Sequence, residues 1–295
     1  MTKIPVSGII LIITCKNNFS QRVLGNRLRL KYSELSGWPI IYLIGDPNLQ
    51  SAWERRKCSM SETDVIDVLV VKTEDSYINL FKKIVFGYRA LSEIYDIEQG
   101  IIKCDDDVLL NKSALMEFIE TSPKLDYIGK CYSKTDYRLT CPLENIGSKY
   151  SADVANYFAT HLDALAETRK IIPHFSPDEY ARIPALPEGY GCAGPLYYVS
   201  IHAIRLIIRL FLSCNSNLFH RDPDSNSYPF VCEDIGTSFI LGKAGIKFVR
   251  NDLMFHNTWQ YGGDIENTIG FHTCIQGRTI HSIPRDIIKF LTQDE

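Results

Sequence analysis

The sequence lacks several features that would assign a function directly. No apolar run approaches the roughly 20 residues of a membrane-spanning helix, and the longest early run covers only residues 9–13. The nine cysteines include no CxxC pair, so a zinc site is unsupported. No glycine-rich phosphate loop, internal repeat or low-complexity linker is present. A net charge of -3 gives no support for broad nucleic-acid binding.

These absences favour an ordinary soluble protein. Apolar residues make up 45% of the chain and charged residues 23%, which are usual values for globular proteins. A chain of 295 residues can form one large α/β domain or two modest ones. Lys3 and the apolar run after it weakly resemble an export signal, but no small-residue cleavage site follows. We therefore expect a core strand there, reduced cysteines, no membrane anchor and a cytoplasmic location.

The first part of the chain alternates apolar runs of strand length with helical stripes. We predict strands at 8–14, 40–44, 65–71 and 100–104, and helices at 19–36, 49–60 and 78–95, the second of them weak. Strands that alternate with helices indicate an α/β fold with a parallel sheet and helices on both faces. The loops at the carboxyl ends of these strands should meet at one edge, where open α/β sheets bind ligands. These loops are residues 14–18, 45–48, 73–77 and 105–107.

The second part of the chain is less regular. We predict helices at 113–120, 152–168, 201–212 and 235–242, strands at 125–129 and within 190–200, and an edge strand at 246–250. Residues 131–187 are polar, rich in tyrosine and interrupted by prolines. Long irregular segments in compact domains are often lids or binding loops. We expect this segment to shape a binding site.

Three consecutive aspartates, Asp105, Asp106 and Asp107, follow the fourth predicted strand. Adjacent carboxylates repel one another, and an ionised group that is buried without a partner is costly. Mg2+ and Mn2+ prefer carboxylate oxygens and keep open positions for phosphate. A divalent cation site is one interpretation of this triplet, and a solvated acidic turn is the other.

A second acidic pair, Glu233 and Asp234, opens the predicted helix at 235–242. Acidic residues at a helix N-terminus stabilise the positive end of the helix dipole, which is a purely structural role. A carboxylate there could instead take a proton from an attacking hydroxyl as a general base. In that case Glu233 would hold the start of the helix while Asp234 faces the substrate.

Several other polar residues also allow two interpretations. His256 follows a probable strand, where it could be a packed or surface residue or could add a nitrogen ligand to a carboxylate metal site. Arg22, Arg27 and Lys83 lie on or near helices beside the expected binding edge. Each of them could be a solvated surface residue or could contact a diphosphate.

Several motifs together resemble one known family. They are Asp75-Ser-Tyr-Ile-Asn-Leu80 with Lys83, Lys103-Cys-Asp-Asp-Asp-Val108, Glu233-Asp-Ile235, the spacing of Arg22 and Arg27, the strand at 41–45, and the stretch 190–200 with Gly194 and Tyr198. They fall in the family's order across roughly residues 9–260. The chain resembles the β1,3-glycosyltransferases related to β1,3-galactosyltransferases, β1,3-N-acetylglucosaminyltransferases and Fringe (glycosyltransferase family 31).

This resemblance implies a GT-A fold, a Rossmann-like mixed sheet flanked by helices, in a single catalytic domain over residues 1–295. The nucleotide-sugar half would cover about 1–110 and the acceptor half about 111–295. The implied reaction is inverting transfer from a UDP-sugar to a hydroxyl of an oligosaccharide or glycoprotein glycan. Asp107 would bind Mn2+, or Mg2+ in its place, His256 would complete the protein part of the metal shell, and Asp234 would be the base. The donor would contact Thr14, Arg22, Arg27, Asp75, Tyr77, Asn79, Lys83, Asp105 and Asp106.

The chain departs from the family pattern in several places. Animal members of the family usually carry an N-terminal membrane anchor, a stem and disulfides, whereas the first predicted strand of this chain begins at residue 8, so we expect a cytoplasmic protein of a microbe or a large DNA virus. The family's R-x-T-W segment is absent after Arg27, and Gly194-Pro195-Leu196 lacks a second glycine. The donor sugar therefore does not follow from the resemblance. Two alternative functions also remain: a metal-dependent nucleotidyl- or phosphotransferase, and a non-catalytic protein that binds a nucleotide sugar.

Overall fold

The computed structural model describes residues 2–16, 35, 37–59, 65–121, 124–131, 138–139, 155–171, 173, 176, 189–213, 233–258, 264–273, 287 and 289. The strands are β1 (Ile4–Ile13), β2 (Ile40–Gly45), β3 (Trp53–Ser59), β4 (Val65–Val71), β5 (Tyr95–Asp105), β6 (Val108–Leu110), β7 (Tyr127–Gly129), β8 (Arg138–Leu139), β9 (Gly189–Tyr190), β10 (Leu196–Ser200), β11 (Val249–Arg250), β12 (Phe255–Asn257) and β13 (Gly270–His272). The helices are α3 (Leu80–Ile94), α4 (Lys112–Thr121), α6 (Leu162–Ile171), α7 (Ile201–Ser213) and α8 (Glu233–Lys243).

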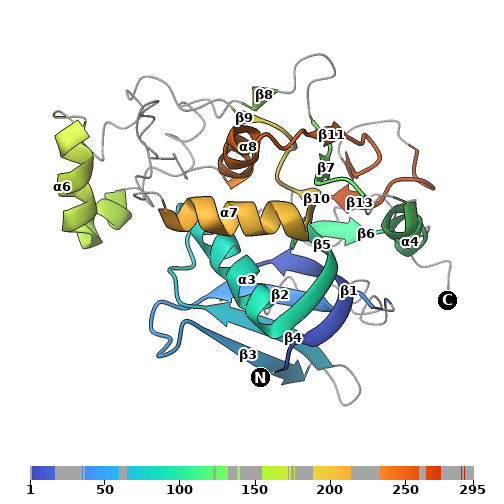
Figure 1. Ribbon diagram of the computed structural model, residues 1–295, viewed down its shortest axis with the longest axis horizontal. Coiled ribbons are helices and arrows are strands. Elements are labelled where there is room, and N and C mark those ends of the chain that lie inside the picture. Colours follow the sequence, from blue (N-terminus) through green and yellow to red (C-terminus); the bar gives the residue numbers. More distant parts are fainter. Residues whose placement is uncertain are drawn as a thin grey trace.

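The main sheet of the described residues has the strand order β11-β7-β10-β5-β1-β2-β4-β3. The expected parallel arrangement is confirmed for β5, β1, β2 and β4. Two further strands make the sheet mixed, because β10 is antiparallel to β5 and β7, and β3 is antiparallel to β4. The result is the Rossmann-like mixed sheet flanked by helices that was expected for a GT-A fold (Figure 1).

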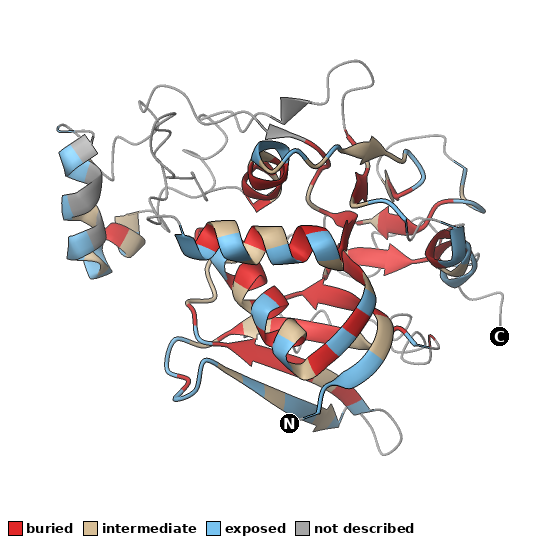
Figure 2. Cartoon of the chain, in the orientation of Figure 1, coloured by how far each residue is buried: buried red, intermediate tan, exposed pale blue. Residues whose placement is uncertain are grey.

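The centre of the sheet is buried on both faces because β1 is apolar on both sides. Ile9 and Leu11 join a core cluster with residues of α3 and α7. Ile10 and Ile12 point the other way and join a second cluster with residues of α4. Figure 2 shows the buried central strands between exposed helix surfaces. Burial of alternate side chains in two separate cores explains why this strand reads as a continuous apolar run.

A second, three-stranded sheet of order β12-β13-β6 lies next to the end of β5. The chain leaves β5 at Asp105, turns at Asp106 and Asp107, and continues as β6. β6 pairs antiparallel with β13, and β13 pairs parallel with β12. This pairing brings residues 255–257 and 270–273 near the acidic turn, although more than 140 residues separate them from it in sequence.

The helix expected at 49–60 is wrong, because residues 53–59 form the strand β3. β3 is an edge strand whose charged residues stay largely in water, so it lacks the apolar run that marks the central strands. Its register with β4 is set in part by a cross-strand ion pair, in which Arg55 lies 3.0 Å from Asp67. Opposite charges on neighbouring strands stabilise such pairings modestly.

Other predicted elements have mixed outcomes. The helices at 78–95, 113–120, 201–212 and 235–242 are confirmed as α3, α4, α7 and α8, and the edge strand at 246–250 is confirmed as β11. The helix predicted at 152–168 is divided at His161 into residues 155–160 and α6. The helix predicted at 19–36 falls almost entirely outside the described residues. Among the helices that the structure describes, none has the length and apolar character needed to span a bilayer.

Candidate active site

Thr14 and Asp106 join the carboxyl ends of β1 and β5. Thr14 Oγ1 donates a hydrogen bond of 2.7 Å to Asp106 Oδ2. The backbone N–H of Asp106 donates to the carbonyl of Ile13 at 3.1 Å. Both side chains are buried. A carboxylate that is buried and hydrogen-bonded in this way does not belong to a solvated turn, so that interpretation is wrong for Asp106.

Lys83 fixes the loop at 73–77 beside the end of β1. Its side chain, on the first turn of α3, is only 3% exposed. Its Nζ donates to the Thr14 carbonyl and to Asp75 Oδ1, each at 2.7 Å. The other oxygen of Asp75 accepts the backbone N–H of Lys16 at 2.6 Å. Surface solvation is therefore wrong for Lys83, which forms a buried ion pair instead.

The next part of this loop contacts a distant segment of the chain. Asn79 is buried, and its Nδ2 donates to Glu74 Oε2 at 3.1 Å and to Ser76 Oγ at 2.9 Å. Glu74 Oε1 lies 3.5 Å from Nε2 of His161. Tyr77 is 39% exposed. The 131–187 segment, expected to shape a binding site, thus contacts the 73–79 loop through at least one of its described residues.

Lys103 lies at the centre of a buried polar network. It sits on β5 with 0% exposure, and its Nζ donates to Asp105 Oδ1 and to the Gly194 carbonyl, each at 2.5 Å. Glu233 Oε2 at the start of α8 lies 3.3 Å from the same Nζ. The hydroxyl of Tyr197 donates to Glu233 Oε1. Three segments therefore meet at one buried ammonium group: the end of β5, the turn before β10 and the start of α8.

Burial perturbs the protonation of this network. Loss of hydration raises the pKa of Glu233 to about 7, against a lowering by the ammonium of Lys103. Loss of hydration also raises the pKa of Asp105 to about 6, although 32% of that side chain is exposed. The ammonium of Lys103 lowers the pKa of Asp105, and the carboxylate of Asp107 raises it further. Perturbed carboxyl pKa values of this kind are typical of functional sites.

Asp234 follows Glu233 on the first turn of α8. Its Oδ1 accepts the backbone N–H of Ile235 at 2.9 Å, and a backbone hydrogen bond from Gly194 also reaches its carboxylate. Burial raises the pKa of Asp234 from its ordinary value, against the lowering effect of these bonds and of Lys103. Both carboxylates lie near Gly194, because a Cβ atom placed there would be 3.5 Å from Glu233 Oε2 and 3.8 Å from Asp234 Oδ2. The Glu233 carboxylate is bound by Lys103 and Tyr197, so Asp234 is the candidate base of the two.

Asp107 lies next to an imidazole that was not predicted from the sequence as a site residue. Nε2 of His272, on β13, lies 3.6 Å from Asp107 Oδ1, and both side chains are mostly buried. Thr273 donates two hydrogen bonds to the Asp107 carbonyl, from its backbone N–H at 2.9 Å and from Oγ1 at 2.7 Å. These bonds fix the position of the turn. Nδ1 of His272 lies 2.9 Å from Oδ1 of Asn257. An amide oxygen only accepts hydrogen bonds, so Nδ1 donates, and in the neutral ring Nε2 keeps its lone pair.

His256 lies on β12, next to Asn257 in sequence. Because successive side chains of a strand point to opposite faces, His256 faces away from the side on which Asn257 contacts His272. Its assignment as a metal ligand stays a prediction. Among the described residues, no group of three or more histidine, cysteine and acidic side chains has the geometry of a complete metal site. Arg22 and Arg27 lie outside the described residues.

Two site residues were missed for different reasons. Lys103 belongs to the quoted acidic motif, and a lysine within the apolar run 101–104 was a usable signal of a buried, paired charge. His272 has no comparable signal, because no metal-ligand spacing in the sequence connects it with Asp107. Only the pairing of β13 with β6 brings the two side chains together.

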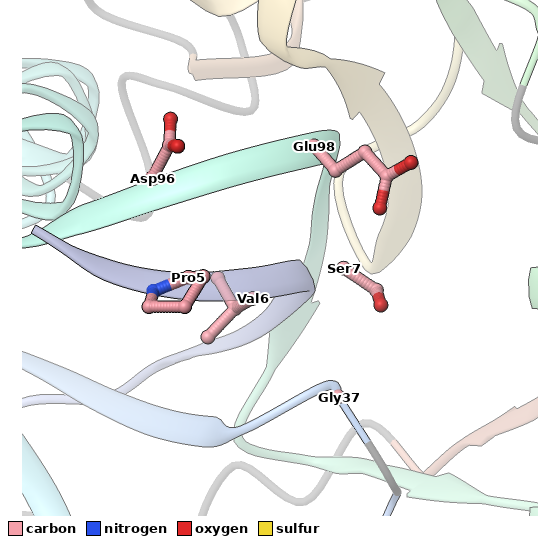
Figure 3. Close-up of a pocket in the computed structure, with 6 residues that line it drawn as sticks. All are labelled: Pro5, Val6, Ser7, Gly37, Asp96 and Glu98. Carbon is pink, nitrogen blue, oxygen red and sulfur yellow. The ribbon is translucent and has the colours of Figure 1, made fainter.

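A cavity of about 460 Å³ lies at the opposite edge of the sheet (Figure 3). It is lined by Pro5, Val6, Ser7, Gly37, Asp96 and Glu98. Five of these residues lie at the amino ends of β1 and β5, and Gly37 precedes β2. At about 3.3 Å per residue, β1 separates them from the Thr14 region by on the order of 20 Å. None of the predicted site residues that the structure describes lines this cavity.

Comparisons with solved structures give similarities of low identity. A glycosyltransferase involved in glycosylation of the major capsid of PBCV-1 aligns with 10% identity and a TM-score of 0.46, over 90% of this chain and 93% of that one. A galactosyltransferase, LgtC, solved with donor and acceptor sugar analogs, gives 9% and 0.45 over 96% and 95%. Mouse xyloside xylosyltransferase 1 gives 10% and 0.39 over 92% and 98%. No curated protein matches the sequence.

The match to a protein family is more direct. The family model described as Galactosyltransferase matches residues 29–216, which is more than half of the chain. This range contains the 73–79 loop, the Asp105–Asp107 turn and Gly194, whereas Glu233, Asp234 and His272 lie beyond it. The resemblance inferred from the motifs is confirmed, and the chain belongs to the galactosyltransferase family of glycosyltransferases.

Proposed function

We propose that the protein is a metal-dependent, inverting glycosyltransferase that moves a sugar from a UDP-sugar to a hydroxyl of a glycan acceptor and forms a β-linkage. The observation that carries the proposal is the convergence of the Asp105–Asp107 turn and the start of α8 on Lys103. In a member of this family, that convergence supports the proposal of a metal-binding turn and a general base at the carboxyl ends of the strands, where such sheets bind ligands. Residues 1–110 are proposed to bind the nucleotide sugar, and residues 111–295 the acceptor.

The residues around Asp107 fit a hard divalent cation. Asp107 offers a carboxylate oxygen, and Nε2 of His272 offers a lone pair. A metal-binding histidine usually donates its other ring N–H to a fixed acceptor, as Nδ1 of His272 does to Asn257. Asp107 and His272 would hold the ion. His256, the metal ligand predicted from the sequence, is the alternative to His272. A bound Mn2+ or Mg2+ would neutralise charge on the departing diphosphate.

Asp234 is the proposed general base. Its carboxylate accepts backbone N–H groups, and among the described residues no cation forms an ion pair with it. Burial raises its pKa from the ordinary value, and a base with a pKa closer to the working pH transfers a proton more effectively. Deprotonation of the acceptor hydroxyl on the face opposite the diphosphate would give a single displacement with inversion.

The 73–79 loop is the proposed donor-binding element. The ion pair of Lys83 with Asp75 and the bonds of Asn79 hold this loop beside Thr14. A preformed loop of this kind binds with a smaller loss of conformational entropy. The exposed ring of Tyr77 is the proposed direct contact of this loop with the nucleotide.

Two measurements test the proposed function. Thermal unfolding with UDP-, GDP-, CMP- and dTDP-sugars, each with Mn2+ or EDTA, should show a Mn2+-dependent rise in Tm with a UDP-sugar, because a ligand of the native state stabilises it. The donor found in this way then enters a transfer assay with a panel of glycan acceptors, in which NMR of the product reports the anomeric configuration.

Each alternative predicts a different result. Retention of configuration would contradict a single displacement. Incorporation of the nucleotide into product would favour the nucleotidyl- or phosphotransferase. A Mn2+-dependent Tm rise without turnover of any donor would favour the non-catalytic binding protein.

A further inference from the structure

Lys103 is a buried cation that the proposed chemistry does not use directly. Its ammonium has three N–H donors and no acceptor. Their partners come from three segments: Asp105 at the end of β5, the Gly194 carbonyl before β10, and Glu233 at the start of α8. A fully buried charge is retained only where paired and hydrogen-bonded groups offset the lost hydration.

The peptide at Gly194 extends this connection to the proposed base. Its carbonyl accepts from Lys103 Nζ at 2.5 Å, and a backbone hydrogen bond from Gly194 reaches the carboxylate of Asp234. The neighbouring Pro195 carbonyl accepts the backbone N–H of Asp105 at 2.9 Å. Lys103 therefore contacts the acidic turn directly and reaches Asp234 through a single residue.

Glu233 supplies the second connection between Lys103 and α8. One of its oxygens faces Lys103 and the other accepts the hydroxyl of Tyr197, so the carboxylate is held from two sides. The ammonium also lies 5.4 Å from the centre of the Tyr197 ring. Since Glu233 precedes Asp234, its fixed position also fixes where the first turn of α8 begins.

We propose that Lys103 is a positioning residue for sugar transfer, which sets the separation between the Asp105–Asp107 turn and Asp234. This inference rests on the proposed function. Transfer requires the donor held at the turn and the hydroxyl activated by Asp234 to meet in one geometry. A displacement of about 1 Å in such an arrangement can lower the rate about 100-fold.

The test is a steady-state comparison of Lys103→Met with wild type. We expect kcat to fall about 100-fold, with little change in the donor KM and in UDP affinity measured by calorimetry with Mn2+. Arg55→Met is the matched control, because it breaks an ion pair with Asp67 on the remote edge of the sheet. It should reduce Tm while leaving kcat unchanged.

A second variant separates positioning from stability. In Lys103→Met/Glu233→Gln, residue 233 is neutral, so no buried carboxylate is left at that position without its cation and Tm should recover. The kcat should stay low, because Asp105 and Gly194 still lack the ammonium group. Recovery of kcat together with Tm would overturn the proposal, as would wild-type kcat in folded Lys103→Met. If the wild-type protein transfers no sugar, the proposed function fails and this inference fails with it. If the wild-type protein and both variants transfer sugar at equal rates, only the inference is overturned.

Discussion

The two ends of β5 both carry acidic residues, in opposite settings. At the amino end, Asp96 and Glu98 are exposed and line the cavity of Figure 3. At the carboxyl end, Asp105 is partly buried and hydrogen-bonded to Lys103, which also faces the buried Glu233. At the amino end, exposure to water leaves the carboxylates hydrated. At the carboxyl end, burial is tolerated only because an ammonium group lies among them.

This difference separates an acidic patch from a candidate catalytic site. Acidic residues occur at both ends, and the cavity of about 460 Å³ lies at the amino end. What distinguishes the carboxyl end is the convergence of several segments on charges that water cannot fully hydrate. Such groups have shifted pKa values and fixed positions, which proton transfer and ion binding both require. The predictions below test whether function follows this distinction.

The largest expected effect comes from Asp234→Asn at the carboxyl end. Loss of a general base typically lowers turnover about 100- to 10,000-fold, and kcat should fall within this range. The asparagine oxygen can still accept the Ile235 N–H, so the fold and the affinity for UDP with Mn2+ should be retained. Steady-state kinetics and calorimetry measure the two quantities. Asp96→Asn is the same substitution at the amino end and serves as the control, and turnover equal to wild type in Asp234→Asn would remove this residue as the base.

A smaller effect is expected from the imidazole beside Asp107. His272→Ala should weaken Mn2+-dependent UDP binding by at least about 10-fold, because loss of even a hydrogen-bonding partner of a metal ligand typically costs about 10- to 100-fold. His256→Ala is its matched partner, since it removes the same group from the opposite face of the neighbouring strand. Titration of UDP at several Mn2+ concentrations compares the two. If only His256→Ala weakens binding, the histidine expected from the sequence is the ligand and His272 has a packing role.

The sequence predicts the centre of the sheet well and its edges poorly. The strands β1, β2, β4 and β5 are apolar because they are covered on both faces, and that cause is visible in the residues themselves. β3 is half exposed, and its charged residues resemble a weak helix until its pairing with β4 is known. The direction of β10 depends on the path of the chain between β7 and α7, which local composition does not encode.

The candidate site shows the same limit. Asp107 and Asp234 could be selected from acidic motifs, because clustered carboxylates demand an explanation wherever they occur. His272 could not, because its role depends on a strand pairing across 164 residues. Lys103 lies within the acidic motif 103–108, but the motif alone predicts no role for it. Its importance comes from burial and from contacts with Gly194 and Glu233, which lie far away in sequence and are brought to it by the fold.

Glu233→Gln probes the carboxyl end through the pH dependence of stability. The pKa of Glu233 is raised from 4.5 to about 7 in the folded state, so the folded protein keeps this proton where the unfolded chain has lost it. Its contribution is therefore fully present below about pH 4.5 and is lost as the pH rises through about 7, by roughly 3 kcal/mol. Glu233→Gln should not show this loss of stability between low and high pH. Denaturant unfolding at pH 5 and pH 8 compares the two proteins, and parallel changes in both would contradict the shifted pKa.

The smallest effect is expected from the double variant Asp96→Asn/Glu98→Gln, which neutralises two carboxylates at the amino end of β5. Both side chains are exposed, and surface substitutions of this kind usually change stability by less than about 0.5 kcal/mol. Turnover, UDP affinity and Tm should equal those of wild type, because the changes lie on the order of 20 Å from Thr14 along β1. A clear loss of turnover in this variant would give the cavity a role in the reaction. In that event burial and convergence would no longer distinguish the working end of the sheet, and the assignment of the site to the carboxyl end would have to stand on the Asp234 and His272 variants alone.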